Sequence, residues 1–279
     1  MPGFPQTVVL SDTYRKPADF LAELFAIYES NQEAWSHQSS EAWILYFQYN
    51  ASNLMKQYWN HSYRLSKEEL ECISSSIQQF QLGESSDGSS LLQRAKTHAR
   101  KYDDPAYVKA IELFIREEQR HGSHLARFMI QQSIPLLKKH WLDGIFRVLR
   151  KLAGLEVAAR VLLTAEIIAI PYYSALSEST DAPLLQNICM QILRDETYHL
   201  VFQACTLGKI CAKRTTLLNR TAHALHKFLM AITIPTVWMG HRKSLSRGGY
   251  DFAKFKKESL AILNVLNQIE NLVAKSKQH

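Results

Sequence analysis

The sequence predicts an all-α protein organised around a four-helix bundle, and two observations carry this prediction. Only 10 glycines and 8 prolines occur among 279 residues, a composition that favours long helices over the tight turns of a sandwich or barrel. Two Glu-x-x-His pairs, Glu118 with His121 and Glu196 with His199, lie 78 residues apart in segments with an apolar helical face. Residues three apart share a helix face, so each pair directs a carboxylate and an imidazole to one point. The repeated motif predicts a four-helix bundle that holds a pair of metal ions. Two of its helices would each supply a Glu-x-x-His pair, and the other two would each supply one glutamate.

Start and stop signals place the remaining helices around this bundle. Ser66, with Glu69 three residues later, forms a capping-box pattern, and Pro105 stands at the favoured first position of the next helix. After an irregular arm of 16 residues, we expect helices over residues 17–30, 40–58, 66–101, 105–132, 143–177, from 179 onward, 215–231 and 251–274. Residues 1–65 would then cover the bundle, residues 66–208 would form it, and residues 209–279 would pack on it as basic C-terminal helices.

The third bundle helix offers two candidate metal ligands, Glu156 and Glu166. The turn to the fourth helix centres near residue 180, so the partner level with Glu196 should precede the turn by a similar number of residues. Glu156 would be misplaced by about 12 Å along the helix, whereas Glu166 is nearly level. Glu166 also has apolar neighbours on its face, and Glu156 has Arg160 at the spacing of an ion pair. We therefore expect Glu166 to be the ligand.

The first bundle helix offers Glu84 and Asp87 on one face. Turn counting slightly prefers Asp87 and does not decide between them. The segment Gly83-Glu84-Ser85 is similar to the Gly-Glu-Ser of the first metal-binding helix in rubrerythrins, and this resemblance implies Glu84 as the ligand, with Asp87 as the alternative.

Residues 74–205 resemble the ferritin-like di-iron carboxylate superfamily, which implies a ferritin-like four-helix bundle with two iron ions. Arg194-Asp195-Glu196-Thr197-Tyr198-His199 is similar to the Arg-Asp-Glu-x-x-His of the ribonucleotide reductase small subunit. The position of that subunit's radical tyrosine holds Leu125 here, which argues against radical storage. Rubrerythrins also carry Cys-x-x-Cys pairs in a second iron site, and this sequence has none.

The expected ligand set is Glu84, Glu118, His121, Glu166, Glu196 and His199. Four carboxylates balance the charge of two ferrous ions, and carboxylate with imidazole suits iron, manganese or a mixed pair. We expect Asp195 and Glu117 to accept the free ring N–H of the histidine on the opposite helix and fix its orientation. Tyr172, Tyr173 and Tyr198 are candidates for relaying protons or electrons or for lining a substrate pocket.

Charge and hydropathy bound the function further. The formal net charge is +7, and from Lys209 onward 13 Lys and Arg face 3 acidic residues. We interpret this bias as a solvated face rather than a surface for nucleic acid or an acidic partner, because basic and aromatic residues do not interleave there. No export signal and no apolar stretch of about 20 residues is evident, so we expect a cytoplasmic protein with reduced cysteines.

The leading hypothesis is a di-iron oxidase or oxygenase that reduces O₂ and oxidises an organic, apolar substrate with electrons from an unidentified donor. The alternative is an iron-handling protein that oxidises Fe²⁺ or reduces peroxide. A third hypothesis is a di-iron hydroxylase that modifies nucleic acid. Only the basic charge of the C-terminal region supports it. The sequence is compatible with a homodimer.

Overall fold

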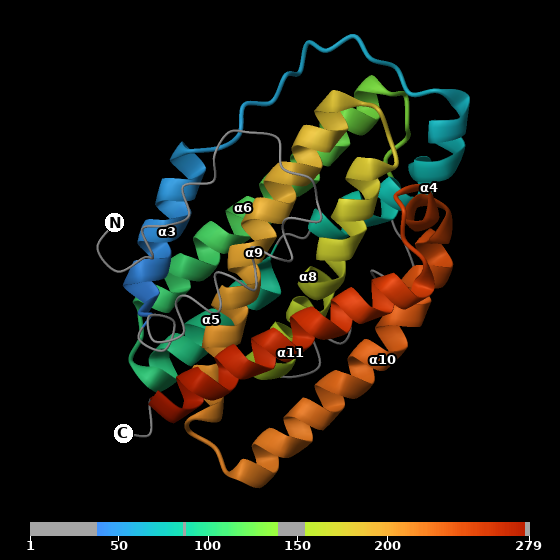
Figure 1. Cartoon of the computed structure of the whole chain (residues 1–279). Coiled ribbons are helices and arrows are strands. Elements are labelled where there is room, and N and C mark those ends of the chain that lie inside the picture. The colour runs from blue at the N-terminus through green and yellow to red at the C-terminus, as the bar shows by residue number, and fades with distance from the viewer. Residues whose placement is uncertain (1–37, 86–87, 139–153, 277–279) are drawn as a thin grey trace.

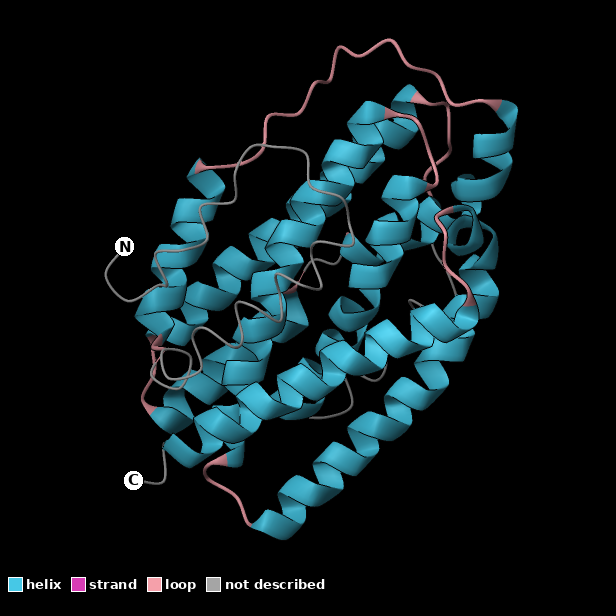
Figure 2. Ribbon diagram, in the orientation of Figure 1, coloured by secondary structure: helices cyan, strands magenta, loops and turns pink. Residues whose placement is uncertain are grey.

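The computed structural model of the chain describes residues 38–85, 88–138 and 154–276, and within these ranges every regular element is a helix (Figures 1 and 2). The prediction of an all-α protein is thus confirmed for the described residues. In chain order the helices are α3 (Ser40–Ser52), α4 (Lys67–Glu84), α5 (Ser89–Tyr102), α6 (Ala106–Gln131), α8 (Leu155–Glu178), α9 (Pro183–Cys211), α10 (Thr216–Arg247) and α11 (Phe252–Ser276). The expected helix at 17–30 lies outside the described residues.

The capping box at the start of α4 forms as the sequence indicates. Ser66 Oγ accepts from the Glu69 backbone N–H at 3.2 Å, and Glu69 Oε2 accepts from the Ser66 N–H at 2.7 Å. The same Glu69 carboxylate accepts from the Thr180 hydroxyl at 2.6 Å and the Asp181 N–H at 3.0 Å. One buried side chain therefore both begins α4 and ties it to the turn between α8 and α9.

Four predicted boundaries are wrong. The helix expected over 143–177 begins at Leu155, because Gly154 before it has an extended backbone, and residues 139–153 lie outside the described residues. The helix expected over 66–101 is two helices: α4 ends at Glu84, and α5 begins at Ser89 after Gly88, which takes a left-handed conformation with φ of 67°. The helix expected over 40–58 ends at Ser52, and an irregular segment follows it. The helix expected to end near residue 231 continues through Pro235 to Arg247, since buried Ile234 and Val237 keep this stretch packed against the core.

Helix α9 lies at the centre of the molecule and is buried along almost its whole length (Figure 1). It packs against α8, α6 and α11, while α3 lies along α6, and α10 lies along α8 and α4. Such all-round burial explains why the α9 sequence is apolar on every face except at a few polar positions. Gln191, Asp195, Glu196 and His199 are among its buried polar residues, and buried polar side chains need partners.

Gly248 and Gly249 separate α10 from α11 as expected, with Gly249 at a φ of 78°. No helix in the described ranges combines the length and apolar character that crossing a membrane requires.

Candidate metal centre

The structure brings the six expected ligands together from four helices. They are Glu84 at the end of α4, Glu118 and His121 on α6, Glu166 on α8, and Glu196 and His199 on α9. They form two overlapping groups, and within each group one potential ligand atom from every member lies within 4.8 Å of the others. The first group is Glu84, Glu118, His121 and Glu196, and the second is Glu166, Glu196 and His199. Glu196 belongs to both groups, which is the position a bridging carboxylate would occupy.

Both histidines turn their Nδ1 atoms toward the carboxylates. His199 Nδ1 lies 2.9 Å from Glu118 Oε1 and 3.4 Å from Glu196 Oε2. His121 Nδ1 lies 3.5 Å from Glu196 Oε1 and 3.8 Å from Glu84 Oε2. These atoms are close together, yet neither Nδ1 makes a hydrogen bond of good geometry within the described residues. The side chains converge on a common space rather than pairing with one another.

Unpartnered polar atoms mark the same space. Across the described part of the chain, these buried atoms of the centre make no hydrogen bond: Glu118 Oε1, His121 Nδ1, both Oε atoms of Glu166, Glu196 Oε2 and His199 Nδ1. A buried polar atom without a partner destabilises a protein by about 1–3 kcal/mol, so such a concentration requires compensation. Bound cations would provide it, because oxygen and nitrogen atoms such as these are able to bind metal ions. The residues therefore fit a pair of metal ions.

The outer nitrogen of each histidine contacts an acidic residue on the opposite helix. His121 Nε2 lies 2.8 Å from Asp195 Oδ2, and His199 Nε2 lies 3.0 Å from Glu117 Oε2. This crossed pairing is the arrangement expected from the sequence. It fixes the orientation of each ring and leaves Nδ1 as the ring atom that could bind a metal ion.

Three further residues hold these outer acids, and the sequence interpretation missed them. Asn50 Nδ2 donates to Glu117 Oε1 at 2.6 Å and to Asp195 Oδ1 at 2.7 Å. Arg120 Nη2 lies 3.2 Å from Glu117 Oε1 and 2.9 Å from Asp195 Oδ2. Gln191 Nε2 donates to Asp195 Oδ1 at 2.8 Å. Helical spacing to Glu117 and Asp195 gives a signal for Arg120 and Gln191, but Asn50 comes from α3 and has no local signal.

The titration behaviour reflects these contacts. Burial opposes ionisation of Asp195, but its hydrogen bond to His121 and the charges of His121 and Arg120 hold the pKa of Asp195 well below its usual range. Burial likewise lowers the pKa of His121, but the hydrogen bond to Asp195 and the nearby carboxylates of Glu196 and Glu84 outweigh burial and raise that pKa well above 6.5. Burial and the nearby charge of Glu196 raise the pKa of Glu166. The raised pKa values of His121 and Glu166 favour their protonated forms, which reduces the negative charge of the centre.

The three candidate tyrosines occupy different places. Tyr173 on α8 donates its phenol hydrogen to Glu84 Oε1 at 2.6 Å. The Tyr172 phenol pairs with Ser76 at 3.1 Å, and the Tyr198 ring stacks on Tyr46 with centroids 4.4 Å apart. Tyr173 is thus the tyrosine with a hydrogen bond to a candidate ligand.

Gly122 allows α4 and α6 to approach closely at the centre. A Cβ atom at Gly122 would lie 2.8 Å from Ser85 Oγ and 3.2 Å from the backbone carbonyl carbon of Glu84. Any larger residue would therefore push away the helix end that carries Glu84.

The alternative ligand Asp87 lies outside the described residues. Glu156 pairs with Arg160 at 3.3 Å and with Arg214, in line with its expected structural role.

A second group with metal-ligand chemistry, Cys211, His223 and Glu270, lies between α9, α10 and α11. Here Glu270 is already paired, because Arg160 Nη2 lies 2.7 Å from its Oε1 and His223 Nε2 lies 2.9 Å from the same atom. Burial opposes ionisation, but these partners lower the pKa of Glu270 to about 2. We interpret this group as a buried ion network, since the Arg160 charge occupies the place of a cation.

Comparisons of the chain with protein-family models, curated proteins and solved structures found no match.

Proposed function

We propose that the chain is a ferritin-like di-iron carboxylate protein that reduces O₂ and oxidises an organic, apolar substrate. The observation that carries this proposal is the pair of ligand groups that share Glu196. One ion would be held by Glu84, Glu118, His121 and Glu196, and the other by Glu166, Glu196 and His199. Manganese or a mixed pair would fit the same ligands.

Charge supports two divalent ions rather than one. The four carboxylates carry about −4 when ionised, and two divalent cations cancel that charge, while the histidines add neutral ligands. A single divalent ion would leave a buried excess of negative charge. Iron bound here would supply redox chemistry toward O₂, for which carboxylate and imidazole ligands are suited.

The residues around the ligands have distinct tasks in this proposal. Asp195 and Glu117 orient the two histidines so that Nδ1 of each faces the ions. Tyr173 holds a proton on its phenol oxygen, 2.6 Å from Glu84, within reach of a ligand that gains negative charge. The apolar side chains of α8, including buried Leu163, Ile167 and Ile170, keep water from this side of the centre.

Oxygen uptake by the Fe²⁺-loaded protein tests the proposal. Wild type, Glu196→Gln and Glu112→Gln would be compared; Glu112 lies on α6 and forms an exposed ion pair with Lys109 at 3.1 Å, so it serves as the matched control. We expect rapid O₂ consumption in wild type and Glu112→Gln, and a rate lower by about tenfold or more in Glu196→Gln.

Uptake no faster than that of free Fe²⁺, or equal rates in all three proteins, would contradict the proposal. Continued uptake with a chemical reductant and an apolar substrate supports oxygenase activity. Uptake that stops once the added Fe²⁺ is oxidised, whatever organic compound is present, would replace it with iron handling.

A further inference from the structure

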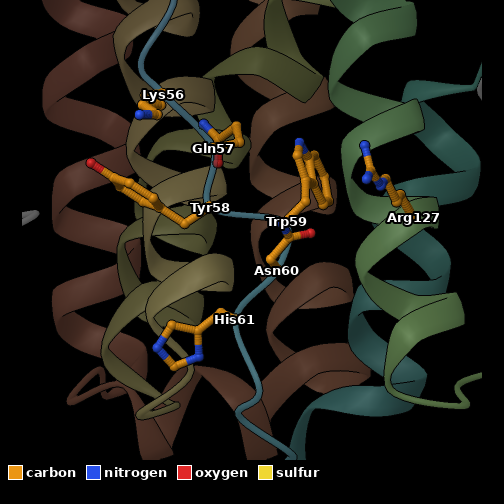
Figure 3. A pocket seen from close by; sticks show the side chains of 7 residues that line it. All are labelled: Lys56, Gln57, Tyr58, Trp59, Asn60, His61 and Arg127. Carbon is orange, nitrogen blue, oxygen red and sulfur yellow. The ribbon is translucent and has the colours of Figure 1, made fainter.

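A surface pocket lies beside the irregular segment that follows α3. It has a volume of about 580 Å³ and is lined by Lys56, Gln57, Tyr58, Trp59, Asn60, His61 and Arg127 (Figure 3). Six of these residues are consecutive, and Arg127 comes from α6. The volume falls within the range of sites for small organic molecules. No part of the proposed metal chemistry uses this pocket.

The wall of the pocket formed by residues 55–61 is held in place, although this segment is not helical. Side-chain amides from α9 and α6 bind its backbone: Asn187 Nδ2 donates to the Lys56 carbonyl at 2.7 Å, and Gln131 Nε2 donates to the Trp59 carbonyl at 3.1 Å. Gln191 Oε1 accepts from the Met55 N–H at 2.7 Å. A wall fixed in this way loses little conformational freedom when a ligand binds.

Charge and aromatic surface in the pocket indicate the class of ligand. The lining contains Lys56 and Arg127 but no acidic residue, and the sequence from residue 53 to 66 has no Asp or Glu. The Arg127 guanidinium lies 4.0 Å from the centre of the Trp59 ring. Tyr58 is 62% exposed, and the Lys56 ammonium lies over its ring, 5.6 Å from the ring centre. Figure 3 shows Tyr58 and Arg127 on opposite sides of Trp59.

We propose that this pocket binds an organic anion that carries a planar ring, such as a nucleotide. The ring would stack on the exposed aromatic surface, and the anionic group would pair with Lys56 and Arg127. A free nucleotide and one nucleotide of a single strand present the same chemistry, so both are sources to be distinguished by experiment.

The pocket wall is also connected to the candidate metal centre. Gln191, which accepts from the Met55 N–H, donates through Nε2 to Asp195, and Asp195 contacts His121. His124, one turn beyond His121, packs its ring against Trp59 with centroids 5.3 Å apart. A molecule bound in the pocket would therefore lie next to residues that orient a candidate ligand.

Calorimetric titration of the metal-free protein with AMP tests this inference and does not depend on the proposed function. Adenosine supplies the ring without the charge, and inorganic phosphate supplies the charge without the ring. We expect saturable AMP binding that is about tenfold tighter than binding of either part. Arg127→Gln and Tyr58→Ala should each weaken AMP binding by about tenfold. Arg64→Gln, an exposed change in the same segment outside the lining, should leave it unaltered.

Unfolding curves that match wild type show that each variant is folded, and Tyr58→Phe, which keeps the stacking face, should retain the affinity lost in Tyr58→Ala. Absence of saturable binding, or equal affinity in wild type, Arg127→Gln and Tyr58→Ala, would overturn the inference. Phosphate binding as tight as AMP binding would also overturn it, by removing the role of the ring. Tighter binding of single-stranded oligo(dA) than of AMP would identify a strand as the source, and equal or weaker binding a free nucleotide.

Discussion

Asn50 of α3 donates a hydrogen bond from Nδ2 to Asp195 of α9 over 2.7 Å, joining side chains 145 residues apart. The same nitrogen donates to Glu117 at 2.6 Å, so one amide from outside the ligand-bearing helices holds both acids that orient the histidines. Both acids are buried, and buried carboxylates need hydrogen-bond donors such as this amide.

Replacing Asn50 with alanine should destabilise the metal-free protein. Two buried carboxylates would each lose a donor, and we expect the free energy of unfolding to fall by about 1–3 kcal/mol, measured by urea unfolding. Asn53→Ala is the matched control, because Asn53 is exposed and its amide donates only within its own segment, to the Tyr49 carbonyl. Equal stability of Asn50→Ala and wild type would show that the hydrogen bonds from the Asn50 amide do not stabilise the metal-free protein.

Glu166→Gln should stabilise the metal-free protein while impairing metal binding. Burial and the charge of Glu196 raise the pKa of Glu166 well above its usual value, so the ionised carboxylate destabilises the fold as pH rises through that raised pKa. The variant should therefore gain on the order of 1–3 kcal/mol at pH 8 and less at pH 5. Urea unfolding at both pH values measures this, with exposed Glu178→Gln on the same helix as control. Lower stability than wild type at pH 8 would contradict the account.

Glu69→Gln should destabilise the protein in a pH-dependent manner. Burial opposes ionisation, but hydrogen bonds from Thr180, Ser66, Asp181 and Tyr63 lower the pKa of Glu69 to about 2. The pKa is depressed in the folded state, so this stability is fully present above pH 4.5 and is lost as pH falls toward 2. We expect a loss of about 1–3 kcal/mol at pH 7 that shrinks between pH 4.5 and 2, measured by urea unfolding against exposed Glu68→Gln. If Glu69→Gln lowered the free energy of unfolding equally at pH 7 and pH 2, the hydrogen bonds to the ionised Glu69 carboxylate would not be the source of this stability.

Gly122→Ala should disturb the centre through backbone contact. Its Cβ atom would press on Ser85 and on the backbone of Glu84, so we expect a loss of about 1–3 kcal/mol and weaker metal binding. Gly240→Ala serves as control, because a Cβ atom there meets nothing within 4 Å and should stabilise α10 by about 0.5–1 kcal/mol. Equal metal affinity of Gly122→Ala and wild type would show that the end of α4 can move without consequence.

Local spacing explains why the sequence predicted five of the six side chains, whereas Glu84 was implied by the resemblance to rubrerythrins and not by turn counting. Glu118 with His121 and Glu196 with His199 share helix faces by geometry alone, and turn counting placed Glu166 level with them. The crossed contacts of Asp195 and Glu117 followed from the approximate symmetry of the two helices. By contrast, the role of Asn50 depends on how α3 packs against the bundle, which no local pattern specifies.

The wrong boundaries have physical causes of the same kind. The capping box at Ser66 predicted where α4 begins but not that it ends at Glu84, and Gly88 before α5 has a positive φ that is not helical. The continuation of α10 through Pro235 depends on tertiary burial of Ile234 and Val237, which outweighs the lost backbone hydrogen bond. The pocket beside Trp59 arises from an irregular segment pinned by distant amides and was not foreseen either.

The most direct test of the central claim is the metal content of the purified protein after iron loading and dialysis. Wild type and Glu112→Gln should each retain two metal ions per chain, one for each ligand group that shares Glu196. Glu118→Ala and Glu196→Ala should retain fewer than two, since each removes a ligand. Equal metal content in all four proteins, or a wild type that retains no pair of ions, would contradict the account.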